Sequence, residues 1–262
     1  MSFENKVVIV TGGAAGIGKG IAECFAMERA NVVIADWNAE DGEAVKIDLE
    51  SRYGIQAMFV KMDASSEEDA RKTAEAALNR WGQIDVLVNN VGTHLYKQLL
   101  EFRMEEWDRL MAVDLRSCFL MARSVLPNMI SRGHGSIVNI SSIHANQSEP
   151  LYTAYAAAKG GVVALTRSMA AEYASSGIRV NAVLPGLTRN KAIDEQLSQC
   201  DEGERRKTLA RWGKAVPLGR IADPVDIGHS VVFLASDKAA YITGASLTVD
   251  GGLTSTLKMD FE

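Results

Sequence analysis

Residues 7–18 read Val-Val-Ile-Val-Thr-Gly-Gly-Ala-Ala-Gly-Ile-Gly, a β-branched apolar run that passes into a glycine-rich turn. The run predicts a buried strand, and the helical pattern Ile17–Glu28 begins where the glycines end. Glycines let the backbone turn tightly and approach an anion, and a helix start presents free N–H groups and a positive dipole end. The residues expected to cradle a diphosphate are Gly12, Gly16, Ile17 and Gly18. The alternative is a tight strand-to-helix turn that binds no ligand.

The same succession of an apolar run, a turn and a helical pattern is repeated along the chain. Several runs, such as VVIA and IVNI, are apolar throughout, which is typical of parallel strands covered on both faces. The predicted strands are Lys6–Thr11, Asn31–Asp36, Gln56–Lys61, Asp85–Asn89, Gly135–Ile140, Ile178–Leu184 and Ser246–Val249. The predicted helices are Ile17–Glu28, Ala39–Tyr53, Glu67–Trp81, Met104–Arg132 (as two helices), Leu151–Ala174 and Pro224–Ala235. This alternation predicts an α/β fold, a doubly wound parallel sheet of about seven strands with helices on both faces.

The chain is expected to form one domain, residues 1–262. Its 47% apolar and 23% charged residues are those of an ordinary globular protein. It contains no linker, repeat or low-complexity block that would favour two domains. The one long irregular stretch, Leu187–Lys214, is charged and lacks a strand, so we predict that it is a substrate lid.

Charge and residue counts exclude several other functions. A net charge of −5 argues against a nucleic-acid partner. Three widely spaced cysteines and four histidines form no zinc pattern, so no metal site is expected and the thiols are predicted to be reduced. No apolar stretch is long enough for a membrane span, and the N-terminus is too short for a signal peptide. We therefore expect a soluble protein in the cytoplasm.

The end of the second predicted strand carries a cofactor signal. Asp36, followed by Trp37, lies at the spacing at which an acidic residue accepts hydrogen bonds from ribose hydroxyls. A carboxylate about 4 Å from the 2′-phosphate of NADP, at an effective dielectric constant of about 20, would repel it by up to ~4 kcal/mol. The glycine-rich turn supplies no cation to offset this repulsion, so NAD is the predicted cofactor. The alternative for Asp36 is a solvated loop carboxylate.

A second motif, Tyr155-Ala156-Ala157-Ala158-Lys159, predicts acid–base chemistry. Positions i and i+4 share one face of a helix, so the phenol and the ammonium stand one turn apart. A cation about 4 Å away, at an effective dielectric constant of about 20, stabilises a phenolate by up to ~4 kcal/mol. Tyr155 is therefore a candidate general acid and base. A hydroxyl at the end of the fifth strand would polarise a substrate carbonyl, and both Ser142 and Ser141 are candidates for it.

In this order and spacing, the motifs resemble those of the short-chain dehydrogenase/reductase family over nearly the whole chain. The matching residues are Thr11–Gly18, Asp63, Asn89–Gly92, Ser142, Tyr155 with Lys159, and Pro185–Gly186 with Thr188. The resemblance implies a Rossmann-like domain that transfers a hydride between NAD(H) and a secondary alcohol or ketone. It also implies that Ser142 orients the substrate oxygen, Tyr155 exchanges its proton, and Lys159 holds the nicotinamide ribose.

The resemblance further assigns the cofactor contacts. Asp63 is expected near the adenine, and Asn89 and Gly92 near the adenosine half. Gly186 and Thr188 are expected near the nicotinamide. The complete expected cofactor set is Gly12, Gly16, Ile17, Gly18, Asp36, Trp37, Asp63, Ala64, Asn89, Gly92, Tyr155, Lys159, Pro185, Gly186 and Thr188.

One position departs from the family pattern. Asp114, in Val113-Asp114-Leu115, stands where the family usually has an Asn that helps to anchor a water feeding protons to the active-site lysine. An ionised Asp accepts a hydrogen bond but donates none, and its charge would act on Lys159. Asp114 is therefore a candidate catalytic residue. The alternative is that it only caps or bends a helix.

The candidate substrate contacts are His94, His144 and Asn190, on loops at the edge of the sheet where such folds bind ligands. The alternative for each histidine is a turn residue that faces solvent or backbone. The charged lid has few aromatic residues, unlike the cover of a steroid or a long acyl chain. We therefore expect a small polar hydroxylated substrate, such as a sugar, a sugar acid or a polyol. The alternatives are a 3-oxoacyl-thioester (acyl-carrier-protein) reductase and a catalytically silent NAD-binding sensor.

The two longest helical segments are candidates for a subunit interface. Met104–Arg132 and Leu151–Ala174 carry apolar residues on more than one side. The resemblance implies that they pair across a two-fold axis in a homodimer or homotetramer.

Overall fold

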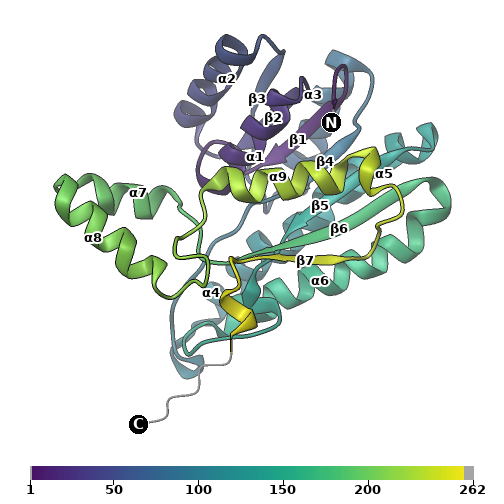
Figure 1. Cartoon of the computed structure of the whole chain (residues 1–262). Coiled ribbons are helices and arrows are strands. Elements are labelled where there is room, and N and C mark those ends of the chain that lie inside the picture. Colours follow the sequence, from purple (N-terminus) through teal and green to yellow (C-terminus); the bar gives the residue numbers. More distant parts are fainter. Residues whose placement is uncertain (1, 257–262) are drawn as a thin grey trace.

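Seven parallel strands form the sheet at the centre of the molecule (Figure 1). The computed structural model describes residues 2–256, apart from the side chain of residue 192, so residues 1 and 257–262 of the expected domain lie outside the described part. The strands are β1 (Val7–Thr11), β2 (Asn31–Asp36), β3 (Ala57–Lys61), β4 (Val86–Asn89), β5 (Gly135–Ile140), β6 (Ile178–Pro185) and β7 (Ser246–Val249). Their order is β3-β2-β1-β4-β5-β6-β7, which confirms the doubly wound parallel sheet predicted from the sequence.

Helices cover both faces of this sheet. They are α1 (Gly16–Met27), α2 (Ala39–Tyr53), α3 (Glu67–Trp81), α4 (Met104–Met111), α5 (Ser117–Arg132), α6 (Thr153–Tyr173), α7 (Lys191–Ser198), α8 (Glu202–Gly213) and α9 (Pro224–Ala235). One hydrophobic cluster joins α1, α2 and α9 to one face, and a second joins α3, α5 and α6 to the other. Successive residues of β1 contribute to opposite clusters, which is why the run is apolar throughout.

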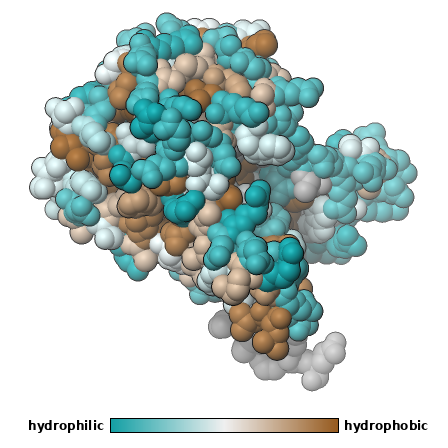
Figure 2. All heavy atoms as spheres, turned by 180° about the vertical axis from the view of Figure 1, so that it is seen from behind, coloured by the Kyte–Doolittle hydropathy of each residue, from teal (hydrophilic) through white to brown (hydrophobic). Residues whose placement is uncertain are grey.

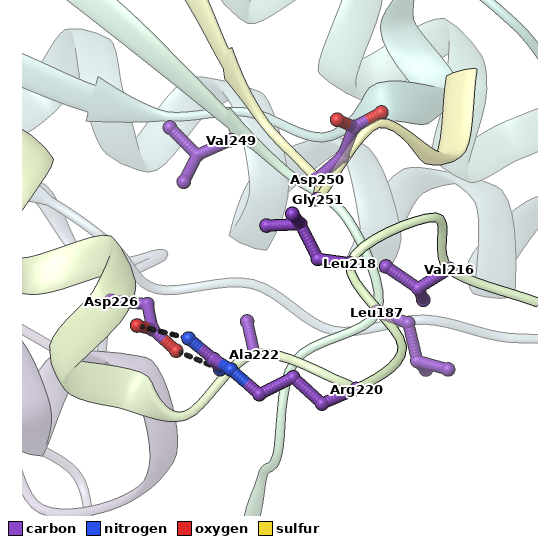
Figure 3. Close-up of a pocket in the computed structure, with 9 residues that line it drawn as sticks. All are labelled: Leu187, Val216, Leu218, Arg220, Ala222, Asp226, Val249, Asp250 and Gly251. Carbon is purple, nitrogen blue, oxygen red and sulfur yellow. Dashed lines mark hydrogen bonds and ion pairs between the residues drawn. The ribbon is translucent and has the colours of Figure 1, made fainter. Parts of the chain in front are cut away.

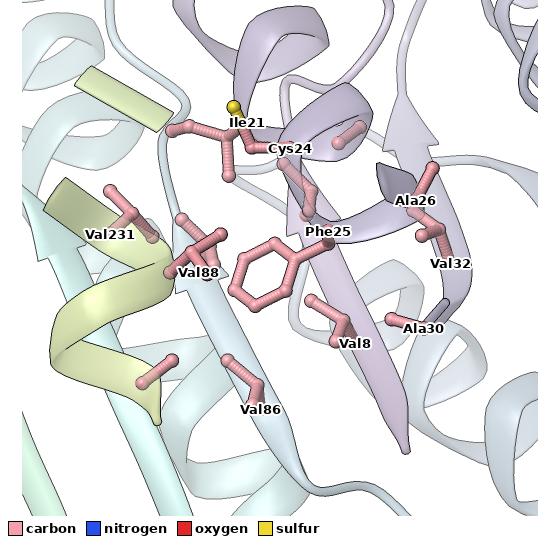
Figure 4. Close-up of a cluster of buried hydrophobic side chains, with 14 of the residues drawn as sticks. Val8, Ile21, Cys24, Phe25, Ala26, Ala30, Val32, Val86, Val88 and Val231 are labelled. Atoms are coloured by element: carbon pink, nitrogen blue, oxygen red, sulfur yellow. The ribbon is translucent and has the colours of Figure 1, made fainter. Parts of the chain in front are cut away.

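Phe25 of α1 shows how the first cluster is held together. Its ring is fully buried among side chains of β1, β4 and α9, including Val8, Val88 and Val231 (Figure 4). Burying a side chain of this size contributes about 1.5–3 kcal/mol. This packing fixes the start of α1 above the end of β1, where the glycine-rich turn lies.

Helices α1 and α6 differ from their predicted ends by one or two residues, and two differences from the prediction have a local structural reason. The segment predicted as two helices over Met104–Arg132 is α4 and α5, but a π-helical turn at Ala112–Arg116, rather than a loop, joins them. Helix α6 begins at Thr153, because Leu151 has a φ of 76°, a left-handed conformation that cannot continue a right-handed helix.

The predicted lid is more ordered than its sequence suggested. It contains α7 and α8, which project away from the sheet in Figure 1. A short parallel bridge pairs Thr188 with Ala222, so the excursion closes at Ala222, beyond the predicted end at Lys214. Two backbone hydrogen bonds of 2.9 Å hold this base, from Arg189 N–H to Ala222 O and from Ala222 N–H to Leu187 O.

The surface is mixed in character. Figure 2 shows brown hydrophobic patches among polar residues on the side opposite to the view of Figure 1, whereas the projecting lid is mostly hydrophilic. Within residues 2–256, no helix combines the length and the apolar character needed to cross a bilayer.

Candidate active site

The glycine-rich turn has the shape needed to receive a diphosphate. Gly12 and Gly16 have φ angles of 63° and 52°, which only glycine adopts without strain. A Cβ on Gly18 would lie 2.0 Å from Gly12 O, so no side chain fits there. Ala15, at the N-cap of α1, provides no side-chain hydrogen bond to the first turn. The N–H groups of Ile17 and its neighbours therefore remain available for an anion.

Asn90 supports this turn from the neighbouring strand. Its Nδ2 donates hydrogen bonds to Thr11 O at 3.0 Å and to Gly12 O at 3.2 Å. From the sequence, Asn90 is recognised only as part of the Asn89–Gly92 motif, without a structural or cofactor-binding role of its own. The contact spans about eighty residues of chain, so only the pairing of β1 with β4 reveals it.

Asp36 lies at the end of β2, beside the turn. Its carboxylate accepts hydrogen bonds of 3.0 Å from Ala14 N–H and from Asn38 N–H, and the residue is buried. The next side chain, Trp37, is 76% exposed. A fixed carboxylate next to free helix N–H groups fits the ribose and diphosphate of a nicotinamide dinucleotide. These residues would hold that cofactor.

The residues expected to contact the adenosine half of the cofactor have different surroundings. Asp63 accepts hydrogen bonds from the hydroxyl and the N–H of Ser65, which lower the pKa of Asp63. Ala64 is buried beside it. The Asn89 side chain instead donates to Asn139 Oδ1 at 2.9 Å and to Cys118 O, inside the protein. That side chain therefore joins β4 to β5 and does not face the expected cleft.

The structure distinguishes the two candidate serines. The Ser141 hydroxyl donates to Lys159 O at 2.8 Å and so anchors α6 to the end of β5. Ser142 Oγ accepts a 3.2 Å hydrogen bond from His144 N–H, which leaves the hydroxyl proton of Ser142 free for another acceptor. Ser142 is therefore the better placed of the two to polarise a substrate oxygen.

Tyr155 and Lys159 lie together on α6, as their spacing predicts. Lys159 Nζ is 5.6 Å from the centre of the Tyr155 ring and donates a 3.2 Å hydrogen bond to Ile140 O. Lys159 is only 3% exposed. Burial lowers the pKa of Lys159, but Tyr155 and then Asp114 raise it by more, so the net shift is upward. The ammonium form is therefore retained in the interior.

Asp114 supplies the negative charge opposite this ammonium. Its Oδ1 accepts a 2.7 Å hydrogen bond from Thr93 N–H, and its Oδ2 lies 3.7 Å from Lys159 Nζ. Within the described residues Oδ2 has no hydrogen-bond partner, because 3.7 Å is too long for a direct hydrogen bond. Complete burial raises the pKa of Asp114 in spite of the nearby Lys159. The π-helical turn carries this side chain, so the turn decides where the carboxyl points.

Gly92 belongs to the same cluster. A Cβ built on it would lie 3.0 Å from Lys159 Nζ and 3.5 Å from Asp114 Oδ2. The family resemblance assigned Gly92 to the adenosine half of the cofactor, whereas the structure places it against the ammonium of Lys159. Glycine here leaves room for that ammonium.

The segment after β6 lies beside a cavity. Thr188 Oγ1 donates to Gly186 O, and a Cβ on Gly186 would meet Asp250 at 2.6 Å, so the turn after Pro185 is tightly held. A cavity of about 210 Å³ lies under the base of the lid (Figure 3). Its lining includes Leu187, Val216 and Leu218, and the Arg220–Asp226 ion pair at one side.

The candidate proton donor, Tyr155, belongs to a cluster of five aromatic rings. The His144 ring stacks on Tyr152, with ring centres 4.0 Å apart, and Tyr152 meets the edge of Tyr96 at 4.9 Å. His94 lies 4.9 Å from Tyr96 and 6.3 Å from Tyr155, and His144 is 5.9 Å from Tyr155. Burial lowers the pKa of His144, which favours a neutral imidazole. The structure thus brings both predicted histidines to Tyr155.

Tyr96 and Tyr152 were absent from the predicted site. Tyr152 precedes Tyr155 by three residues, a spacing that places two residues on one helix face and that could have identified it. Burial, followed by a hydrogen bond with Tyr96, raises the pKa of Tyr152 above its usual range. The Tyr152 phenol therefore stays neutral at physiological pH.

Asn190 does not join these rings. Its Oδ1 caps α7 by accepting a 2.9 Å hydrogen bond from Ile193 N–H. A Cβ on Gly16 would lie 3.6 Å from Asn190 Cα, so the structure places Asn190 at the diphosphate end of the cleft. Among the described residues, no group of three or more His, Cys, Asp or Glu side chains is arranged to hold a metal ion.

Comparisons with known proteins agree with this geometry. A family model described as enoyl-(acyl carrier protein) reductase matches residues 12–254. An uncharacterized oxidoreductase of Bacillus subtilis is 38% identical over 254 residues, covering 96% of this chain and 92% of that protein. A 3-oxoacyl-[acyl-carrier-protein] reductase of Chlamydia muridarum is 38% identical over 249 residues, covering 95% of this chain and 97% of that protein.

A solved structure extends the likeness to three dimensions. The crystal structure of levodione reductase superimposes with a TM-score of 0.89 at 31% identity, covering 97% of this chain and 100% of the other. Enzymes of this kind use a nicotinamide cofactor, for which the turn, Asp36 and Lys159 provide a site. The chain belongs to the short-chain dehydrogenase/reductase family of oxidoreductases.

Proposed function

We propose that this protein is an NAD-dependent dehydrogenase/reductase that acts on a secondary alcohol or its ketone. The observation that carries the proposal is the Tyr155 ring standing 5.6 Å from the buried ammonium of Lys159, with Ser142 at the adjacent strand end. The nicotinamide ring of the bound cofactor supplies the hydride acceptor for oxidation and the hydride donor for reduction. The protein's side chains manage the proton and orient the substrate.

Three side chains share this work. The Ser142 hydroxyl donates a hydrogen bond to the substrate oxygen and fixes it beside Tyr155. The Tyr155 phenol gives its proton to that oxygen during reduction and takes it back during oxidation. Lys159 stabilises the phenolate by its positive charge, and its burial strengthens that attraction because little water screens it.

The preference for NAD rests on Asp36. Both carboxylate oxygens are fixed by backbone N–H groups, so the negative charge cannot swing away from an incoming 2′-phosphate. The described residues that adjoin Asp36 do include a cation, Lys191, but Asp41 already pairs with it. A comparison of kcat/KM for the two cofactors tests this point: a preference for NADP would contradict it.

The cluster of five rings favours a small, polar, cyclic substrate. Tyrosine and histidine rings offer apolar faces together with hydroxyl and imidazole groups that hydrogen-bond to hydroxylated molecules. We therefore favour a sugar, a sugar acid or a polyol. The similar proteins named for 3-oxoacyl-carrier-protein and levodione reduction make an acyl thioester and a cyclic diketone the first comparison substrates.

Replacement of the phenol tests the proposed reaction. Tyr155→Phe should lower kcat by about 10²–10⁴-fold on every accepted substrate, because it removes the proton donor. It should leave NADH binding intact. Tyr173→Phe, the same change at the far end of α6, serves as the control and should keep full activity. Full turnover by Tyr155→Phe would overturn the assignment, and absence of turnover in the wild type on all substrates would favour an NAD-binding sensor.

We further propose a homo-oligomer, either a dimer or a tetramer, in the cytoplasm. Helices α4 and α5 carry large apolar side chains that are 42–66% exposed, namely Met104, Phe119 and Ile130. Cys24, Cys118 and Cys200 are free thiols, which suits a reducing compartment.

A further inference from the structure

A lysine of the lid reaches across the expected cofactor cleft. Lys191 is the first residue of α7, and its Nζ lies 2.5 Å from Asp41 Oδ2 on α2, 150 positions away in the sequence. The backbone beside it rests on the glycine-rich turn, because a Cβ on Gly16 would lie 3.9 Å from Lys191 N. The hydrogen bond to Asp41 raises the pKa of Lys191, and Asp36 adds to the effect. Lys191 therefore joins α7 to α2 next to the glycine-rich turn.

The rest of the lid is held at its base. There, Thr188 pairs with Ala222, and Arg189 Nη1 lies 3.0 Å from Asp223 Oδ1. Beyond this base, α7 and α8 project away from the sheet (Figure 1). A cavity of about 210 Å³ lies beside this base, lined by Leu187, Val216 and Leu218 (Figure 3).

We propose that the Lys191–Asp41 ion pair is a latch that holds the lid over the adenosine half of the bound dinucleotide and slows its release. The inference rests on the dinucleotide site proposed above. Lys191 stands on the diphosphate side of the cleft at Gly16, and Asp41 stands on α2 beyond the ribose carboxylate of Asp36. A ligand that leaves between these two sides must break the pair.

The size of the effect follows from the exposure of the pair. The side chains of Lys191 and Asp41 are 52% and 36% exposed. Breaking an exposed ion pair of this kind should accelerate NADH dissociation by about two- to five-fold. The pair should also weaken as salt screens it. The rate of release matters for turnover, because product release or lid opening limits kcat in many enzymes.

Stopped-flow fluorescence of NADH leaving the full-length protein tests the latch. Lys191→Ala and Asp41→Asn should each release NADH about two- to five-fold faster than the wild type, and the double variant no faster than either. Lys46→Ala is the matched control: it breaks the Lys46–Glu43 pair of 3.0 Å on the same helix α2 and should leave the rate unchanged. Raising the salt concentration should accelerate release from the wild type but not from Lys191→Ala.

Each outcome has one meaning. Equal release rates in the wild type, Lys191→Ala and Asp41→Asn would overturn the latch while leaving the proposed function intact. Failure of the wild type to bind NADH would overturn the proposed function, and the latch with it. Exchanging the charges in the Lys191→Asp, Asp41→Lys protein should restore slow release, which a merely structural role of either residue would not do.

Discussion

The ammonium of Lys159 has almost no free space around it, and Gly92 shows this most directly. In Gly92→Ala the new methyl would lie 3.0 Å from Lys159 Nζ, so the ammonium must move. Because misplacement of a catalytic group by about 1 Å costs on the order of 10²-fold, we expect kcat to fall by about 10–100-fold. Steady-state kinetics check this.

The matching control lies on α6 itself. Gly160→Ala would place its methyl no closer than 3.9 Å to Ala145 O, so it should keep normal activity. Circular dichroism should show both variants folded. Equal kcat values for Gly92→Ala and the wild type would mean that Lys159 does not need its present position.

The buried carboxyl of Asp114 gives a pH-dependent prediction. Its pKa is raised in the folded protein, so the stability it contributes is fully present below the unfolded pKa, about 4, and is lost as pH rises through the folded pKa. Asp114→Asn cannot ionise and escapes this loss. We therefore expect the unfolding free energy of the variant to increase relative to that of the wild type as pH rises above about 4. Urea titrations across this range measure the difference, and a difference that shrinks as pH rises would show that the Lys159 pair outweighs burial.

The same variant tests whether Asp114 takes part in proton transfer. Removing its charge takes a negative neighbour away from Lys159, whose ammonium then stabilises a phenolate more strongly, so the acidic limb of the kcat profile should move to lower pH. An unchanged rate and profile would leave Asp114 with only a structural role in its helical turn.

At the residue scale, local motifs predicted the site and distant contacts completed it. Tyr155, Lys159 and Ser142 were predicted because they follow strand ends or share a helix face. The choice between Ser141 and Ser142 depended on one hydrogen bond to α6, which no local pattern encodes. Lys191 was missed because its partner lies 150 positions away.

Among the secondary-structure elements, the starts of β1 and β4 and the end of α5 meet at one carboxylate. Asp85 accepts hydrogen bonds from Val7 N–H at 2.7 Å, Gln83 Nε2 at 2.9 Å and Arg132 Nη2 at 2.8 Å, with its side chain 1% exposed. Removing one partner of a buried ion pair costs about 3–5 kcal/mol. Asp85→Ala should therefore lower Tm by about 6–20 °C, since 1 kcal/mol shifts Tm by roughly 2–4 °C at this size.

Activity separates this structural role from a catalytic one. Asp85 lies at the opposite edge of the sheet from Tyr155, so kcat at 25 °C should stay unchanged in the folded fraction. Asp48→Ala, which breaks only the exposed pair with Arg52, should change Tm by about 2 °C or less. Similar losses in the two variants would contradict the role given to Asp85.

Regular elements were predicted well because their hydrophobic patterns are local. Strands β2, β5 and β7 and helices α2, α3 and α9 have the bounds predicted from the sequence. Helix α8 was missed because half of its residues are charged and its sequence shows little apolar periodicity, and α7 was missed because it is only eight residues long. The π-helical turn was missed because it depends on how α4 and α5 pack, not on composition.

At the scale of the whole molecule, α5 offers a surface for a second subunit. Phe119 and Ile130 are eleven residues apart, which returns to the same helix face, and they are 48% and 42% exposed. Phe119→Glu would place a charge in that interface, so we expect it to reduce the oligomer to smaller species in sedimentation velocity. Ile47→Glu, at a 62% exposed position on α2, is the control and should keep the wild-type mass. A monomeric wild type would contradict the proposed assembly.

The paired base of the lid has a consequence for the evolution of enzymes of this shape. Because Ala222 is hydrogen-bonded to Leu187 and Arg189, on either side of Thr188, the chain leaves and re-enters the domain at almost one point. The residues between Thr188 and Ala222 can therefore be replaced by a longer or shorter segment without altering the register of any strand. Since we predict that this segment covers the substrate, we expect its transplant from a relative to change the substrate range on an unchanged scaffold.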